Sequence, residues 1–140
     1  MKTSLFLLPS LLVVALSAWM PPAAIAGSET CKNVPISLIN ATNDEIRITK
    51  LEYFDLDNGK LRAETGIFGP DGKQDLQQNK PFDKIRDLEK VNNEPTYLQV
   101  TYRRLIGGNK YEPPVTQISS KFTCRSNMKM ADAVKVEIGK

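Results

Sequence analysis

The sequence contains no histidine, only two cysteines and a single tryptophan, and these scarcities exclude several classes of function. Without histidine, neither a Ser-His-Asp or Cys-His catalytic arrangement nor a histidine-containing zinc site can form. Nineteen basic residues nearly balance sixteen acidic ones, whereas nucleic-acid-binding domains usually carry a strong basic excess. No glycine-rich phosphate loop or paired metal motif is present. We therefore expect no nucleic acid as partner, no cofactor and no metal.

The first 26 residues have the three parts of a secretory signal peptide. Lys2 supplies the positive start, and residues 5–20 form an almost purely apolar run that ends before Pro21-Pro22. Ala24-Ile25-Ala26 then places small residues where a signal peptidase requires them. A retained membrane anchor is the alternative, but about 16 residues make roughly 24 Å of helix, which is shorter than a bilayer core of about 30 Å. We expect a periplasmic or secreted protein whose single mature domain spans residues 27–140, with no transmembrane segment after cleavage.

Cys31 and Cys124 are the only cysteines, and in an oxidising compartment such a pair usually forms a disulfide. The bond would close a loop of about 90 residues and stabilise the fold by roughly 4–5 kcal/mol in the chain-entropy model. Two free thiols and a functional redox pair are the alternatives, although the wide spacing excludes a CxxC motif. We expect a structural disulfide.

Apolar and polar residues alternate with period two in several segments, which predicts strands with one buried face. The clearest segments are 34–38, 46–53, 98–103 and 134–138. The apolar phase shifts by one residue after Ile48, so we expect a β-bulge near Thr49-Lys50. Asn58-Gly59 predicts a tight type I′ hairpin, because both residues tolerate positive φ.

Other segments are less regular. Residues 61–68 could form the returning strand of the hairpin, and residues 69–81 resemble a loop. Residues 82–91 fit neither a strand nor a helix well, and we expect a short strand with an irregular or one-turn helical piece. Ile118, Ser120, Phe122 and Cys124 share one parity, which predicts one strand with all four facing the core. Together these segments predict an all-β fold, a small antiparallel β-sandwich of six to seven strands with immunoglobulin-like architecture.

Asp55 and Asp57, followed by Asn58-Gly59, resemble the start of a calcium loop, although no closing glutamate follows at the required spacing. The same two carboxylates could share a strand face and act as an acid and base pair. One alternative function is therefore a small carboxylate-dependent hydrolase or a metal-dependent enzyme. The ordinary interpretation is a polar hairpin tip, which we prefer.

Charge is divided unevenly, with a net −3 over residues 27–96 and +5 over residues 97–140. If the later strands pair, their polar positions would form one basic surface, which could bind a protein or an anionic surface. The ordinary interpretation, which we prefer, is a solvated sheet face whose lysines and arginines protect edge strands from aggregation. The residues expected to carry such binding are Arg103, Arg104, Lys110, Tyr111 and Lys121. The leading hypothesis is thus an exported non-enzymatic binding or accessory module. A second alternative is an assembly protein whose edge strand pairs with a partner.

We expect the mature protein to begin at Gly27, because Ala24 and Ala26 fit the peptidase pocket. Intact-mass measurement of the exported protein tests this expectation. A mass that still includes Trp19 would contradict it.

Overall fold

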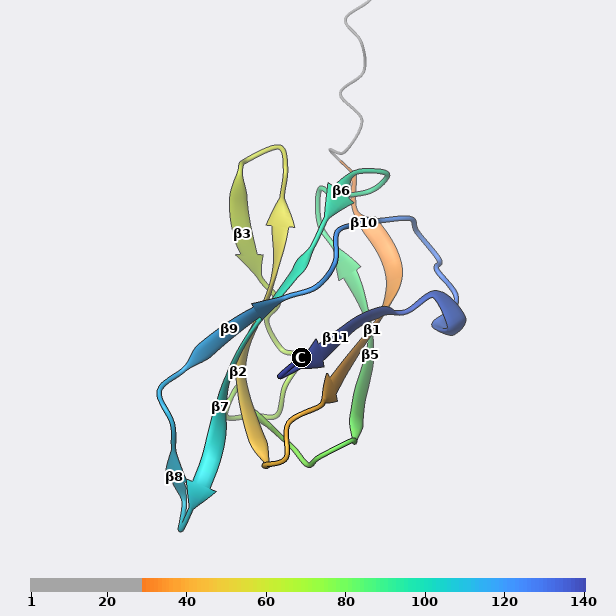
Figure 1. Cartoon of the computed structure of the whole chain (residues 1–140). Helices are drawn as coiled ribbons and strands as arrows, with labels where there is room; N and C mark the ends of the chain where they lie inside the picture. Colours follow the sequence, from red (N-terminus) through yellow and green to blue (C-terminus); the bar gives the residue numbers. More distant parts are fainter. Residues whose placement is uncertain (1–28) are drawn as a thin grey trace, which may run out of the picture.

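The computed structural model describes residues 29–140 (Figure 1). This part of the chain contains eleven strands and one 3-10 turn, joined by loops. The predicted signal segment, residues 1–26, lies outside the described residues. The elements are β1 (Cys31–Asn40), β2 (Ile46–Asp55), β3 (Lys60–Ala63), β4 (Gln74–Leu76), β5 (Pro81–Leu88), β6 (Pro95–Thr96), β7 (Leu98–Gly107), β8 (Lys110–Tyr111), β9 (Val115–Ile118), β10 (Phe122–Thr123), the 3-10 turn η1 (Met130–Asp132) and β11 (Val134–Ile138).

The strands form two main sheets, and their inner side chains make one hydrophobic core. The smaller sheet has the order β11-β1-β5, and the larger has the order β3-β2-β7-β8, with β4 also on β2 and β9 also on β7. A two-stranded ribbon of β6 and β10 lies at one end, near the start of β1, while β8 lies at the opposite end (Figure 1). This arrangement confirms the prediction of an all-β sandwich. The expected six or seven strands are instead divided into more and shorter elements.

The pairing of the last strand differs from the antiparallel prediction. β11 runs parallel to β1, with Ile36 opposite Val134 and Leu38 opposite Val136. All four side chains are buried, so the predicted alternation of both segments is confirmed. Alternation fixes which residues face the core but not the direction in which two strands run, which is why the parallel pair could not be predicted.

The predicted bulge in β2 is confirmed. The register between β2 and β7 shifts between Ile48 and Lys50, so that Ile48 and Leu51 are both buried. Because side chains alternate along a strand, one inserted residue exchanges the two faces for everything that follows. Tyr53 therefore faces the core and Phe54 faces outward.

The hairpin after β2 is longer than the expected two-residue turn. Residues 56–59 form the loop between Asp55 and Lys60, which pair with each other. Only Gly59 has a positive φ, of 61°, whereas a type I′ turn requires positive φ at Asn58 as well. The prediction of a hairpin is confirmed, and the predicted turn type is wrong.

Three of the less regular segments are also corrected. The returning strand ends at Ala63 rather than Phe68. The expected loop contains the short strand β4, which pairs with the first residues of β2. Residues 81–88 form the strand β5, which pairs with β1 and contains no helical turn.

The predicted strand from Ile118 to Cys124 is broken into β9 and β10. Cys124 is buried as expected, but Ile118 is 59% exposed and Ser119 is buried instead. The Ser119 hydroxyl accepts a hydrogen bond from the Leu98 amide at 3.0 Å, which satisfies it inside the sheet. Parity was misleading here because the chain changes pairing partner between Ile118 and Phe122.

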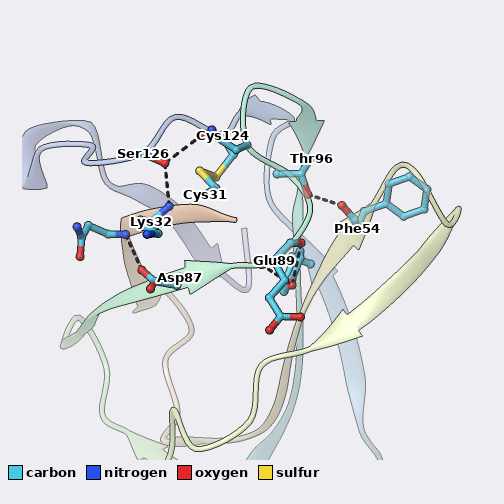
Figure 2. Close-up of a disulfide and its surroundings, with 11 residues drawn as sticks. Cys31, Lys32, Phe54, Asp87, Glu89, Thr96, Cys124 and Ser126 are labelled. Atoms are coloured by element: carbon cyan, nitrogen blue, oxygen red, sulfur yellow. Dashed lines mark hydrogen bonds between the residues drawn. A yellow bond between two sulfur atoms is a disulfide. The ribbon is translucent and has the colours of Figure 1, made fainter. Parts of the chain in front are cut away.

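Cys31 and Cys124 form the predicted disulfide, and both residues are completely buried. The bond joins the start of β1 to the chain after β10 (Figure 2). Beside it, the Lys32 amide donates to the Ser126 hydroxyl at 3.0 Å. Disulfides of this kind are typical of compartments outside the reducing cytosol. No helix within residues 29–140 is long and apolar enough to cross a membrane.

Replacing Val100 with aspartate tests the assigned faces of β7. Val100 is fully buried, so Val100→Asp should lower the free energy of unfolding by roughly 3–5 kcal/mol. Thr101→Asp, on the outward face, should cost less than about 1 kcal/mol. Gln99 is a poorer control because its amide donates to Glu52. Chemical denaturation of both variants measures these losses in the free energy of unfolding. Equal losses would contradict the assigned faces of β7.

Candidate functional site

Four of the five predicted binding residues lie together at the β8 end of the sandwich. Arg103 and Arg104 are on β7, and Lys110 and Tyr111 form β8, which pairs with the end of β7. Arg104 is engaged by Glu112, with 2.8 Å between guanidinium and carboxylate. Within the described chain, Arg103 and Lys110 form no ion pair.

Tyr111 packs against a charged pair rather than standing free. The Arg47 guanidinium lies 4.6 Å from the centre of the Tyr111 ring. It also donates two hydrogen bonds to the Asp75 carboxylate, at 2.6 and 2.7 Å. These contacts neutralise part of the positive charge at this end of the molecule.

Lys121 lies at the opposite end. It directly precedes β10, which pairs with β6, and β6 precedes the start of β7. Arg103 lies in the middle of β7, so about half of that strand separates it from the end at which β6 and β10 pair. The structure therefore does not bring the five residues into one basic surface. β9 leaves β7 at Ile118, and the chain then continues to β10, which pairs with β6, so Lys121 lies beside β6 rather than beside the other four residues.

Asp55 and Asp57 do not share a strand face, contrary to the expectation. Asp55 ends β2 with its carboxylate fully buried, whereas Asp57 is exposed in the hairpin loop. Asn58 and Arg62 both donate to the Asp55 carboxylate. Burial favours a raised pKa for Asp55, but these hydrogen bonds outweigh it and hold the pKa below its usual value. No group of three potential metal ligands occurs among residues 29–140.

A row of apolar side chains on the outer face of the larger sheet was missed from the sequence. The Phe54 and Tyr97 rings are stacked, with centroids 5.2 Å apart and planes 9° from parallel. Leu61 lies opposite Phe54 on the neighbouring strand β3. Ile118 pairs with Gln99, two residues along β7 from Tyr97, so it projects from the same face.

A small groove of about 80 Å³ lies beside this row, and we call it the aromatic groove. Leu56 at its rim is 46% exposed, and the neighbouring Leu61 and Ile118 are 37% and 59% exposed. Lys121 is its single charged wall. The side chains that line the groove are Phe54, Leu56, Pro95, Thr96, Tyr97 and Lys121.

Backbone contacts fix the walls of the aromatic groove. The Phe54 amide donates to the Tyr97 carbonyl at 3.1 Å, and the Thr96 hydroxyl donates to the Phe54 carbonyl at 2.7 Å. Figure 2 shows the Phe54 ring pointing away from the disulfide, on the far side of Thr96. Since the groove is held by hydrogen bonds rather than by flexible side chains alone, it is preformed for a ligand.

The sequence does contain a signal for this site. Phe54 follows Tyr53 and Tyr97 precedes Leu98, so in each pair one aromatic or apolar residue occupies the polar phase of a strand. Aromatic residues in the outward phase are candidates for binding, because burial elsewhere does not explain them. Comparison of the chain with protein families, curated proteins and solved structures finds no match.

Asp55→Asn tests the structural role of the buried carboxylate. The substitution weakens the bonds from Arg62 and Asn58, and should cost about 2 kcal/mol near pH 7. Because the pKa is lower in the folded protein than its usual 3.8, this stability is lost as pH falls below that value. The difference between wild type and variant should therefore shrink in acid. Asp57→Asn should change the free energy of unfolding by less than about 0.5 kcal/mol. Urea unfolding of wild type, Asp55→Asn and Asp57→Asn, near pH 7 and in acid, measures these differences.

Proposed function

We propose that the protein is an exported, non-enzymatic binding module, periplasmic or secreted, that holds a partner protein at the aromatic groove. The observation that carries this proposal is the gathering of exposed apolar side chains around the stacked Phe54 and Tyr97 rings. The inner face of the same sheet supplies the core, and the outer row is not part of that core. Contiguous exposed apolar side chains are typical of interaction surfaces.

The groove has the chemistry of a binding hot spot. Hot spots are enriched in aromatic residues that form preformed pockets at the centre of an interface. Phe54 and Tyr97 are such residues, and the volume of about 80 Å³ suits a single apolar side chain of a partner. The surrounding exposed leucines would exclude water once the partner is bound.

Lys121 defines the charge of the partner. No acidic side chain lines the aromatic groove, and Lys121 forms no ion pair within residues 29–140. A carboxylate next to the inserted apolar side chain would therefore meet an uncompensated cation. The complementary partner is a protein segment with an aromatic or aliphatic residue beside an aspartate or glutamate.

The state of Asp55 supports a non-enzymatic role. It is the more buried of the two carboxylates considered for catalysis, and it is fully engaged by Arg62 and Asn58. The two cysteines are joined in a buried disulfide, which supports a structural rather than a redox role.

Edge-strand pairing is a second candidate, favoured by β5. This strand has eight residues, pairs only with β1 within the described chain, and carries Ile85 with 60% exposure. Charged residues along it, Asp83, Lys84 and Asp87, oppose uncontrolled pairing. The opposite edge of the same sheet is protected, because the Gln117 side chain donates to the Glu137 carbonyl at 2.6 Å and accepts from the Gly139 amide at 2.8 Å.

Capture experiments with matched charge reversals test the proposed docking. The immobilised mature protein is exposed to the periplasmic and secreted fractions of its source, and the captured protein is quantified. Lys121→Glu and Tyr97→Ala should each weaken capture at least about tenfold, equivalent to about 1.4 kcal/mol. Arg103→Glu makes the same charge change in the middle of β7, outside the lining of the aromatic groove, and should leave capture unchanged.

A photo-crosslinking residue at Leu56, but not at Arg103, should also join the same partner covalently. If Arg103→Glu weakens capture as much as Lys121→Glu does, one extended basic face is the better account. If neither Lys121→Glu nor Arg103→Glu weakens capture and Ile85→Lys on β5 abolishes it, pairing at the β5 edge explains capture better than docking at the aromatic groove.

A further inference from the structure

A hollow lies beside the β2 bulge, on a different part of the sheet from the aromatic groove. Its volume is about 690 Å³, which is within the range of small-molecule sites. It shares no lining residue with the aromatic groove. Its walls are mainly glycine, alanine, proline, threonine and phenylalanine, and its two charged lining residues are Lys50 and Glu64.

Strand pairing explains why this hollow exists. β3 pairs with β2 from Glu52 to Asp55, and β4 pairs with β2 from Ile46 to Ile48. The bulged stretch between them pairs with β7 on one side but has no strand beside it on the other. The Glu64 amide donates to the Leu51 carbonyl at 2.8 Å, after which the chain turns away from the sheet and returns at β4.

The chain around the hollow is anchored at several points. Ile67 is only 4% exposed and belongs to the core, and the Phe68 ring packs on Phe82 with 5.8 Å between centroids. Arg86 reaches across from β5 and donates to the Thr65 carbonyl at 2.9 Å. A turn closes where the Gly72 amide donates to the Gly69 carbonyl at 2.8 Å. The hollow is therefore preformed, which lowers the entropic cost of binding.

The two charged side chains at its walls are already neutralised. The Lys50 ammonium lies 2.7 Å from the Glu52 carboxylate, and the Arg86 guanidinium lies 2.9 Å from the Glu64 carboxylate. The Glu64 side chain is only 8% exposed, and burial raises its pKa above the usual value despite Arg86. A charged ligand would have to compete with these internal partners, whereas an uncharged ligand would not.

We propose that this hollow is a binding site for a small, uncharged and mainly apolar molecule that carries a hydroxyl or amide group. The apolar body would lie against Phe68, Pro70 and the glycine backbone. The polar group would lie near the wall formed by Thr65 and Glu64, where hydrogen-bonding atoms border the apolar surface. This activity is independent of partner capture at the aromatic groove.

Fluorescence titration with N-phenyl-1-naphthylamine, an uncharged apolar amine, tests the site. The mature wild-type protein should bind this probe saturably with one-to-one stoichiometry, and should bind its anionic analogue 1-anilinonaphthalene-8-sulfonate at least tenfold more weakly. Amide resonances of Gly66, Gly69 and Gly72 should shift on titration, because these residues line the hollow. Shifts confined to Tyr97 and its neighbours would instead place the probe in the aromatic groove and overturn the proposal.

Substitutions separate the two surfaces. Ala63→Phe enlarges a side chain that lines the hollow and should weaken probe binding at least tenfold, without affecting partner capture. Thr116→Phe adds the same ring to an exposed position of β9 that does not line the hollow, and should have no effect. Tyr97→Ala should weaken capture but not probe binding. The proposed site would be refuted if Tyr97→Ala abolished probe binding while Ala63→Phe did not. It would also be refuted if the wild-type protein showed no saturable binding of the probe.

Discussion

The disulfide between Cys31 and Cys124 is the constraint on which the proposed docking surface depends. The Cys124 amide donates to the Glu94 carbonyl at 3.0 Å, and its carbonyl accepts from the Asn93 amide at 2.7 Å. These bonds attach the ribbon of two-residue strands, β6 and β10, to a point that is covalently fixed at the start of β1. A two-residue ribbon has little stability of its own. The covalent link therefore helps to hold Lys121, which directly precedes β10, beside the hydrogen-bonded Phe54 and Tyr97.

A second constraint is the single extra residue in β2. Without the bulge, the alternation that buries Ile46 and Ile48 would carry Phe54 into the core. With it, Asp55 turns inward to meet Arg62, and Phe54 turns outward to stack on Tyr97. The same bulge lies in the stretch of β2 that neither β3 nor β4 covers. One inserted residue thus contributes to the aromatic groove, to the hollow and to the burial of a carboxylate.

The features that could be predicted from the sequence depend on local periodicity or, for the disulfide, on there being only one possible pair of cysteines. Alternation identifies the buried faces of β1, β7 and β11, the phase shift locates the bulge, and two cysteines allow only one intramolecular bond. The errors concern long-range pairing. Ile118 is exposed because the chain leaves β7 after β9, and Lys121 is far from Arg103 for the same reason. For the candidate site, the outward phase of Phe54 and Tyr97 could be seen, but their stacking requires the β2–β7 register.

The parallel pairing of β1 and β11 also governs when the protein can fold. β1 is the central strand of its sheet, and one of its two neighbours comes from the last residues of the described chain. The disulfide adds a closure over a sequence separation of 93 residues. Contacts between segments so far apart slow folding, because loop-closure entropy is lost before the contacts compensate for it. With this topology, the sheet β11-β1-β5 cannot be completed until the last strand of the described chain is available to pair with β1.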